Sequence, residues 1–381
     1  MNAPSDAALL IGLDSHGLAV ARALASRGVP VYAIERDPRL PGVASRHLTG
    51  HFPVTDFSEE HLLPALRDTR AALKAHRHVV LFPMNDRQVG IVARHIGELS
   101  TLYRISWADA AATVLRLQRK DSLDDASRTQ GLQYPRSVVL ERAEDLRAVT
   151  GFRLPVILKP VMPLSSFKTH VVHSLDEARA FVAGKLSDLP ILCQEYIEGG
   201  DDALFFGELL LDHGRPLFGM TGRKLLSHPP GQGQATVAET HANAEVLRLT
   251  AQFFAGSDLS GPAALELKRD PQGGFWVIEP TIGRTEFLVE LCIAAGFNQP
   301  WMEFELACAR PVEPPERLTD RVWYDTEREP LAYLRLSRQH RSLAPRGKAP
   351  VFPYWGHGDL RPWLRAMGHA IRMRWFRLWG R

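Results

Sequence analysis

The stretch that decides the fold reads Ala264-Leu265-Glu266-Leu267-Lys268, then Asp270-Pro271-Gln272-Gly273-Gly274, then Phe275-Trp276-Val277-Ile278-Glu279-Pro280-Thr281. Apolar residues alternate along both arms and two glycines lie between them, which predicts a β-hairpin. Because side chains alternate along a strand, Glu266 and Glu279 are expected on neighbouring strands, where like charges repel unless a cation lies between them. A divalent ion such as Mg²⁺ would explain the pair, and so would an ordinary hairpin with two solvated glutamates.

The composition is that of a globular protein with more than one domain. A chain of 381 residues exceeds what one core usually holds, so two or three domains are expected. Hydrophobic residues make up 45% and charged residues 23%, which argues against disorder. The net charge of +3 gives no reason to expect nucleic acid as a partner. Cys193, Cys292 and Cys308 have no metal-binding spacing and lie in apolar contexts, which is typical of buried thiols in a reducing cytoplasm.

The beginning of the chain predicts a doubly wound α/β domain. Apolar runs at 7–13 and 31–34, with a helical pattern at 18–26 between them, form a βαβ unit. The turn at 12–17 has two glycines of a dinucleotide fingerprint, and Glu35 lies where a ribose-binding acid is expected. Asp14, however, replaces the glycine that lets the backbone approach pyrophosphate. An NAD-linked oxidoreductase is therefore the least favoured of the functions considered.

Isolated cations mark the middle of the chain. Lys120 ends a helical stretch and Lys159 lies on a strand at 156–160, both among residues that otherwise favour burial. Buried lysines need anionic partners, which phosphates would supply, whereas at the surface the two residues would need none. Ser165 and Ser166 follow in a polar turn whose hydroxyl and N–H groups are suited to cover phosphates.

Two further segments add groups for a nucleotide. The expected strand Gln194-Glu195-Tyr196-Ile197 offers main-chain donors and acceptors, and Glu198-Gly199-Gly200-Asp201-Asp202 follows with carboxylates. This arrangement suits an adenine edge read by the backbone and a ribose held by an acid. Arg223 and Lys224 precede a loop at 228–234 rich in Pro, Gly and Gln, which either closes over a substrate or is simply mobile.

The order of these features resembles the ATP-grasp superfamily, and more narrowly its carboxylate–amine ligases related to carbamoyl-phosphate synthase and D-aspartate ligase. The resemblance spans 7–300 and rests on I-L-K-P, Q-E-Y-I-E-G-G-D-D, T-G-R-K-L, E-L-K and E-P-T-I-G-R in this order. It implies a mixed α/β and α+β chain with a Rossmann-like pre-ATP-grasp domain at 1–110. An ATP-grasp domain with antiparallel sheets would follow at 111–310, with a nucleotide-covering part, 111–200, and a metal-binding catalytic part, 201–310. Residues 311–381 are expected to form an irregular C-terminal extension.

The resemblance also implies roles for single residues. The lysines and serines would contact the ATP phosphates, the hinge strand would read adenine, and an acid after it would bind the ribose. These nucleotide-binding candidates are Lys120, Lys159, Ser165, Ser166, Gln194, Glu195, Tyr196, Ile197, Glu198 and Asp202. The candidate ligands of Mg²⁺, or of Mn²⁺ in its place, are Glu266, Glu279 and Thr281. The candidates for stabilising an acyl-phosphate or holding a substrate carboxylate are Arg223, Lys224 and Arg284.

The implied activity is a ligase reaction in which ATP phosphorylates a carboxylate and an amine then displaces phosphate. An amino acid is the favoured substrate, with Asn85, Asp86, Ser15, His16 and Arg284 as candidates for its recognition. Many relatives carry Asn where this chain has Thr281, and Arg284 follows that position by three residues rather than two. The loop at 162–168 is also poor in glycine, so a catalytically weak ATP-binding or regulatory module is the alternative.

The C-terminal segment 361–381 carries six arginines, three tryptophans and no acid. Its pattern predicts either an amphipathic helix on a membrane surface or a helix packed on an acidic face of its own protein. The N-terminus has no basic segment and no long apolar run, so a signal peptide is not expected. The expected location is the cytoplasm, with peripheral contact to the inner face of the membrane if the tail binds lipid. The sequence leaves open whether the chain forms a homo-oligomer.

Overall fold

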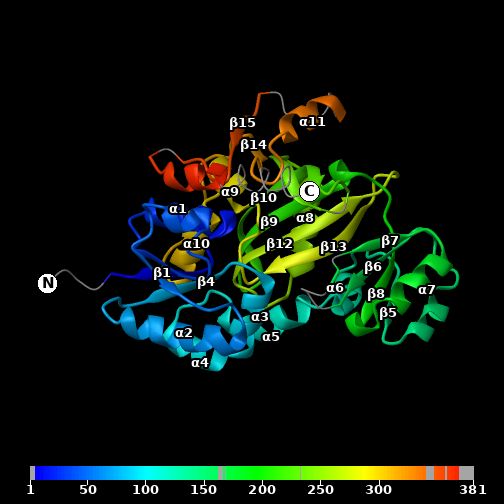
Figure 1. Cartoon of the computed structure of the whole chain (residues 1–381), viewed down its shortest axis with the longest axis horizontal. Helices are drawn as coiled ribbons and strands as arrows, with labels where there is room; N and C mark the ends of the chain where they lie inside the picture. Colours follow the sequence, from blue (N-terminus) through cyan, green and yellow to red (C-terminus); the bar gives the residue numbers. More distant parts are fainter. Residues whose placement is uncertain are drawn as a thin grey trace, which may run out of the picture.

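The computed structural model describes residues 5–161, 166–167, 169–231, 233–339, 347–356 and 358–368. Within these residues the chain forms three sheets and the helices around them (Figure 1). The strands are β1 (Ala7–Ile11), β2 (Val31–Glu35), β3 (Gly50–Pro53), β4 (Val79–Pro83), β5 (Ser137–Leu140), β6 (Val156–Pro160), β7 (His170–Val172), β8 (Ile191–Glu195), β9 (Leu204–Asp212), β10 (Arg215–His228), β11 (Gln234–Thr240), β12 (Gly261–Arg269), β13 (Phe275–Ile282), β14 (Arg321–Tyr324) and β15 (Ala349–Val351). The helices are α1 (Ser15–Ala25), α2 (Glu59–Ala72), α3 (Asp86–Arg94), α4 (Ile96–Leu102), α5 (Ala111–Leu117), α6 (Leu123–Thr129), α7 (Leu175–Ala183), α8 (Ala244–Phe254), α9 (Val289–Ala295), α10 (Gln299–Ala307) and α11 (Ala332–Gln339).

The N-terminal domain is a parallel sheet of order β3-β2-β1-β4 with helices on both faces. Leu9 of β1 belongs to the core shared with α2, whereas Leu10 packs in the core that contains α1. This double coverage explains why β1 is a continuous apolar run, since a parallel strand buried on both faces has no polar side. The predicted doubly wound unit is confirmed.

The first turn of this domain is occupied by the chain's own groups. The Asp14 carboxylate accepts the Gly17 N–H at 3.0 Å and caps α1. The buried Glu35 carboxylate accepts the N–H of Leu13 at 2.7 Å and those of Arg36 and Asp37. Both acids therefore stabilise the turn itself, and neither is free for a dinucleotide.

A second sheet, of order β5-β8-β6-β7, is antiparallel and packs against α7. Val156 and Leu158 of β6 point to α7 and form a core with Ala178 and Val182. The alternate residues of the strand, Ile157 and Lys159, face the opposite side. The period of two thus places a lysine on the inner face of the sheet.

The main sheet has the order β13-β12-β9-β10-β11-β14-β15 and lies between the other two sheets in Figure 1. Its strands pair antiparallel except for β14 and β15, which are parallel. Helix α8 packs on one face through Phe253 and Phe254, while α9 and α10 cover part of the other face. Glu266 is paired with Glu279 across the β12–β13 hairpin, so the predicted register is confirmed.

Residues after 310 differ from the expected irregular extension. Tyr324 of β14 pairs with Val237 of β11, and β15 extends the same edge. Strands this short, set among prolines, give no readable period, and burial beside Leu225 stabilises them instead. Residues 361–368 are helical, and the tail at 369–381 lies outside the described residues. In the part of the chain that the structure describes, no helix has both the length and the apolar character needed to cross a membrane.

Candidate active site

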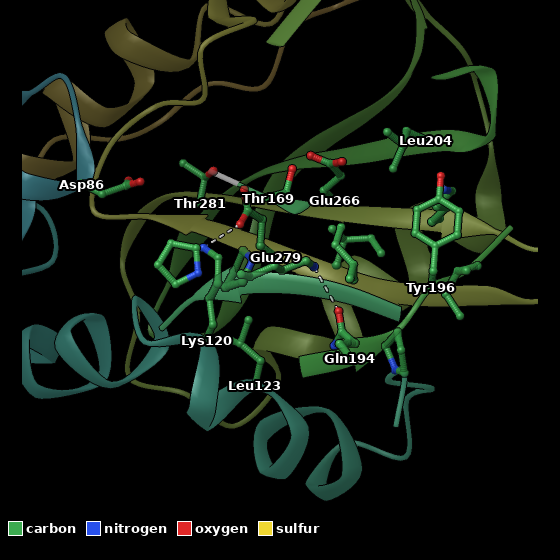
Figure 2. Close-up of a pocket in the computed structure, with 18 of the residues that line it drawn as sticks. Asp86, Lys120, Leu123, Thr169, Gln194, Tyr196, Leu204, Glu266, Glu279 and Thr281 are labelled. Carbon is green, nitrogen blue, oxygen red and sulfur yellow. Dashed lines mark hydrogen bonds and ion pairs between the residues drawn. The ribbon is translucent and has the colours of Figure 1, made fainter. Parts of the chain in front are cut away.

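A cavity of about 600 Å³ lies between the inner face of the β5–β8 sheet and the β12–β13 hairpin (Figure 2). Most of the candidate residues line it, although they come from segments as distant as 120 and 284. The candidates in the lining are Lys120, Lys159, Ser166, Gln194, Glu195, Tyr196, Ile197, Lys224, Glu266, Glu279, Thr281 and Arg284. Arg223, Glu198 and Asp202 are not among the lining residues, and Ser165 lies outside the described residues.

The two facing carboxylates lie at one end of the cavity. Burial raises the pKa of Glu266, and the neighbouring Glu279 carboxylate raises it further, while Lys224 opposes the shift. Lys120 Nζ lies 2.9 Å from Glu279 Oε2, as Figure 2 shows. The Lys120 pKa is raised, chiefly by the charge of Glu279. Lys120 therefore neutralises Glu279, whereas Glu266 remains close to the carboxylate of Glu279.

Lys159 has a different environment, although it lines the same cavity. It is only 8% exposed, and its Nζ donates to the neutral Gln194 amide oxygen at 3.0 Å. Burial lowers its pKa to about 8, and the positive charges of Lys120 and Lys268 add to the shift. A buried ammonium whose hydrogen bond goes to an amide gains from an anionic ligand.

The opposite end of the cavity is formed by the segment that follows β8. The N–H of Glu195 donates to the Arg136 carbonyl and that of Tyr196 to the Pro155 carbonyl. The Glu195 carboxylate accepts the Arg153 N–H at 2.9 Å. Some polar groups of the predicted hinge thus already form hydrogen bonds with neighbouring segments of the protein. The next residue of the cavity wall is the apolar Ile197.

Lys268 belongs to this end of the cavity and was missed as a candidate. Its Nζ donates to the Tyr196 hydroxyl at 3.1 Å and lies 4.2 Å from the centre of the Tyr196 ring. Burial lowers the Lys268 pKa to about 8. The signal was present in the sequence, because Lys268 follows Glu266 by two residues and so shares its face of the strand.

The adjacent cations of β10 are separated by the alternation of the strand. Lys224 lines the cavity, where Nζ donates to the Gly233 carbonyl at 3.1 Å and lies 3.6 Å from Asp201. Arg223 instead donates to the buried Glu239, whose other oxygen lies 2.9 Å from Lys348. Arg223 is therefore engaged in the main sheet and does not reach the cavity in this structure.

The acids after β8 also differ from expectation. The acid that forms side-chain contacts is Asp201, which was not a candidate. Its carboxylate accepts hydrogen bonds from the N–H and the hydroxyl of Ser227 at 2.8 and 2.7 Å. This contact ties the end of the hinge segment to the last residues of β10. Glu198 is exposed and Asp202 is half-buried, both outside the cavity lining.

Two loops of the N-terminal domain meet the segment after β13. Arg284 Nε donates to Asp86 Oδ1 at 2.7 Å, and Nη1 donates to the Thr285 carbonyl at 3.0 Å. His16 Nε2 lies 2.6 Å from the Thr285 hydroxyl, and burial lowers the His16 pKa to about 4, so the ring is neutral near pH 7. Asp86 and Arg284 line the cavity.

The other substrate candidates in these loops do not reach the cavity lining. Asn85 caps α3 by accepting the Gln88 N–H. Ser15 is the first residue of α1, and His16 is buried behind it. Their contribution here is to hold the loops in place.

The donor set suits a metal that takes part of its coordination shell from a ligand. Within the described ranges, no group of three or more His, Cys, Asp or Glu residues is placed to hold a metal ion. Glu266, Glu279 and the Thr281 hydroxyl offer hard oxygen atoms only, and all three line the cavity. Mg²⁺ is commonly bound by one or two carboxylates together with phosphates and water, so the residues fit it.

No protein-family model matches the sequence, and no curated protein matches it. Solved structures do resemble the fold. N5-carboxyaminoimidazole synthetase from Staphylococcus aureus, solved with ADP, has a TM-score of 0.67 at 14% identity, over 89% of this chain and 88% of that one. L-amino acid ligase from Bacillus licheniformis has a TM-score of 0.58 at 17% identity, over 81% and 75%.

The biotin carboxylase domain of 2-oxoglutarate carboxylase from Hydrogenobacter thermophilus gives a similar result. That structure, a dimer with MgADP and bicarbonate, has a TM-score of 0.64 at 14% identity, over 83% of this chain and 73% of that one. At such low identity the three similarities establish the fold, including the arrangement of the sheets around the cavity.

Proposed function

Because the chain has the ATP-grasp fold, we propose that it is an ATP- and Mg²⁺-dependent ligase that joins a carboxylate to an amine. The observation that carries this proposal is the meeting of Lys120 and Lys159 with Glu266 and Glu279 in one cavity. The four side chains come from separate segments, and their charges alternate around a space of about 600 Å³, within the usual range of a small-molecule site.

ATP would lie along the cavity with its base against Tyr196 and Ile197. In this arrangement the phosphates would meet Lys159, Lys120 and Lys224, which the structure places on the cavity wall. Phosphate oxygens would supply Lys159 with the anionic partner that Gln194 does not provide.

Mg²⁺ held by Glu266 and Glu279 would neutralise phosphate charge and orient the terminal phosphate for transfer. Burial and, to a smaller extent, the charge of Glu279 raise the pKa of Glu266, and a cation bound between the two acids would offset both effects. Thr281 would act as a third oxygen ligand, directly or through water.

The chemistry then needs no protein nucleophile. The substrate carboxylate would attack the terminal phosphorus of ATP, the bond from that phosphorus to its bridging oxygen would break, and ADP would leave. The amine would then attack the carbonyl carbon of the acyl-phosphate and displace phosphate. Arg284 uses Nε and Nη1 for Asp86 and Thr285, which leaves Nη2 to act on the carboxylate or acyl-phosphate. Catalysis would consist mainly of positioning and neutralisation of charge.

The test is ADP release from ATP and Mg²⁺, with small carboxylates and the standard amino acids supplied singly and in pairs. Substrate-dependent release is expected in the wild type and in Glu198→Ala, whose side chain lies off the cavity. It should fall to background in Lys159→Ala and Glu279→Ala. Release that survives in both variants would refute the site. ATP binding without release on the whole panel would favour the second candidate, a regulatory ATP-binding module, which the incomplete metal set at Thr281 motivates.

We also propose that the C-terminal edge of the molecule touches an anionic lipid surface. Leu331 and Leu364 are 66% and 60% exposed there. Phe352, Trp355 and Trp363 line an open hollow of about 480 Å³ between the segments that carry them. Exposed apolar and aromatic groups next to an arginine-rich sequence are typical of interfacial segments.

Vesicle co-sedimentation tests this contact. The full chain should pellet with vesicles containing anionic lipid and stay in the supernatant with neutral vesicles. Equal partitioning of the full chain and of a chain ending at residue 360, which keeps Asp359 and its contact with Arg22, would refute the contact.

A further inference from the structure

A second pair of acids consists of Glu208, in strand β9 of the main sheet, and Glu286, in the segment after β13. Glu208 of β9 is paired with Ala264, two residues before Glu266 on β12, so Glu208 and Glu266 lie on the same face of the sheet. Its side chain is 1% exposed. Among the described residues, neither of its carboxyl oxygens has a hydrogen-bond partner.

The charged neighbours of Glu208 are Glu286 and Arg284, and the neutral Cys292 thiol also lies near it. Glu286 is half-buried and accepts the Leu288 N–H through Oε2. Burial raises the pKa of both acids. Glu286 adds to the shift of Glu208, whereas the N–H groups of Leu288 and Phe287 and the charge of Arg284 oppose the shift of Glu286. Arg284 gives Nε and Nη1 to Asp86 and Thr285, so it is not a dedicated partner of either acid.

A buried carboxyl without partners costs free energy, and folded proteins usually remove such groups or satisfy them. The flanking positions on the same face of β9 are Phe206 and Leu210, both in apolar cores. An apolar side chain would therefore suit position 208 better if only packing mattered. A buried acid without hydrogen-bond partners and a half-buried acid, both near Arg284 of the cavity wall, indicate a site that a cationic ligand completes.

We propose that Glu286, backed by Glu208, binds the ammonium group of the amine substrate and accepts its proton. This assignment rests on the ligase function proposed above and specifies where its second substrate is held. Glu286 is the more exposed member of the pair and follows Arg284, which lines the cavity, by two residues. Glu208 is buried near it, and a bound cation would favour the ionised form of both carboxyl groups.

The step is balanced without any further reactant. The ammonium gives one proton to the Glu286 carboxylate, and the neutral amine attacks the carbonyl carbon of the acyl-phosphate. The C–N bond forms, the bond from carbon to the phosphate oxygen breaks, and phosphate leaves with the electron pair. The second proton lost by nitrogen goes to phosphate or water.

Hydroxylamine provides a test that separates this subsite from the rest of the reaction. It is uncharged at neutral pH and traps acyl-phosphates as hydroxamates, so it needs no ammonium-binding group. With the carboxylate identified in the ADP-release panel, Glu286→Gln and Glu208→Gln should still form hydroxamate at a rate close to that of wild type. The KM for the amine substrate should rise by about tenfold or more, with the larger effect in Glu286→Gln.

Glu303→Gln is the matched control. Glu303 is also a buried acid, and burial raises its pKa to about 8, but its partner is Ser106 and it lies on α10. This variant makes the same chemical change and should leave both rates unchanged. Amine binding measured by titration calorimetry without ATP should weaken in Glu286→Gln and not in Glu303→Gln.

Two results would overturn the assignment. If the amine KM is unchanged in both Glu286→Gln and Glu208→Gln, the pair does not bind the amine. If hydroxamate formation falls together with ligation, the acids serve the carboxylate substrate or the fold. Failure of the ligase proposal looks different, because the wild type would then form no hydroxamate with any carboxylate.

Discussion

Lys159 holds a positive charge at a position that water hardly reaches. Such a residue could be predicted from the sequence, because a lysine inside the apolar run Val156-Ile157-Leu158-Lys159-Pro160 has few explanations. The pairing of Glu266 with Glu279 could also be predicted, because the two strands of a hairpin are adjacent in the sequence and the turn fixes their register. The pairing of Arg284 with Asp86 was not, because it joins residues 198 positions apart and depends on how two domains pack.

The ATP affinity should therefore depend on pH through Lys159. Its pKa of about 8 in the unliganded protein lies below that of a free lysine, so the side chain loses its proton as the pH rises through 8. The Kd for ATP should increase over this interval. Lys159→Arg keeps its charge and should show a flatter profile by fluorescence titration. Lys268 has a similar pKa, so Lys268→Met is the control. If the pH profile of ATP binding is unchanged in Lys159→Arg but flattened in Lys268→Met, the effect belongs to Lys268.

If Mg²⁺ binds as proposed, Thr281 would determine how many ligands the protein gives to the metal. Thr281→Asn would place an amide oxygen beside Glu279, and an amide oxygen is a better metal ligand than a hydroxyl. The Mg²⁺ concentration that gives half-maximal ADP release should fall severalfold. An unchanged Mg²⁺ dependence would show that position 281 does not contact the metal.

At the scale of elements, capping and close backbone contacts fix the position of the first turn of α1, which contains His16. The sequence predicted that the first helix begins near Leu18, whereas α1 begins at Ser15 because the Asp14 carboxylate caps it. The helix also packs tightly on β1: a Cβ added at Gly17 would lie 2.2 Å from the Gly12 carbonyl oxygen. A periodic pattern shows that a helix exists, but its first residue depends on capping and contact geometry that periodicity does not contain.

Gly17→Ala should accordingly destabilise the protein by about 2 to 4 kcal/mol, because the added methyl group forces α1 away from β1. Chemical denaturation monitored by tryptophan fluorescence would measure the change. Gly97→Ala on α4 is the control, since a Cβ there would meet no atom within 4 Å. Alanine favours helices over glycine, so this variant should match or slightly exceed the wild type. Equal stability of Gly17→Ala and wild type would mean that the contact relaxes at little cost.

At the scale of the whole molecule, the C-terminal segment fastens the main sheet to the N-terminal domain. Arg22 of α1 donates to Asp359 at 3.0 Å and to the carbonyls of Pro353 and Tyr354 at 3.2 and 3.0 Å. Asp359 also accepts the Ser45 hydroxyl at 2.7 Å. His16 lies in the first turn of the same helix and contacts the Thr285 hydroxyl, so α1 contacts the C-terminal half of the chain at two points. No pattern in the sequence predicts it, since the partners are 337 positions apart and each looks like a surface charge.

Breaking this contact should loosen the domains while leaving the cavity intact. Asp359 is almost fully buried beside Arg22, so Asp359→Asn leaves an arginine charge without its carboxylate and should cost about 3 kcal/mol in the free energy of unfolding. Burial alone would raise the pKa of Asp359, but hydrogen bonds from Ser45, the Arg46 N–H and Arg22 lower it overall. The contribution is therefore present near pH 7 and is lost as the pH falls through the lowered pKa.

Urea unfolding of the wild type and Asp359→Asn at several pH values would measure this contribution. The two curves should converge in acid, and ATP binding near pH 7 should be equal in the two proteins. Arg67→Gln, which breaks the exposed pair with Glu98, is the control and should have little effect at any pH. A difference between wild type and Asp359→Asn that stays constant from neutral to acid pH would show that the ionised carboxylate is not what joins the domains.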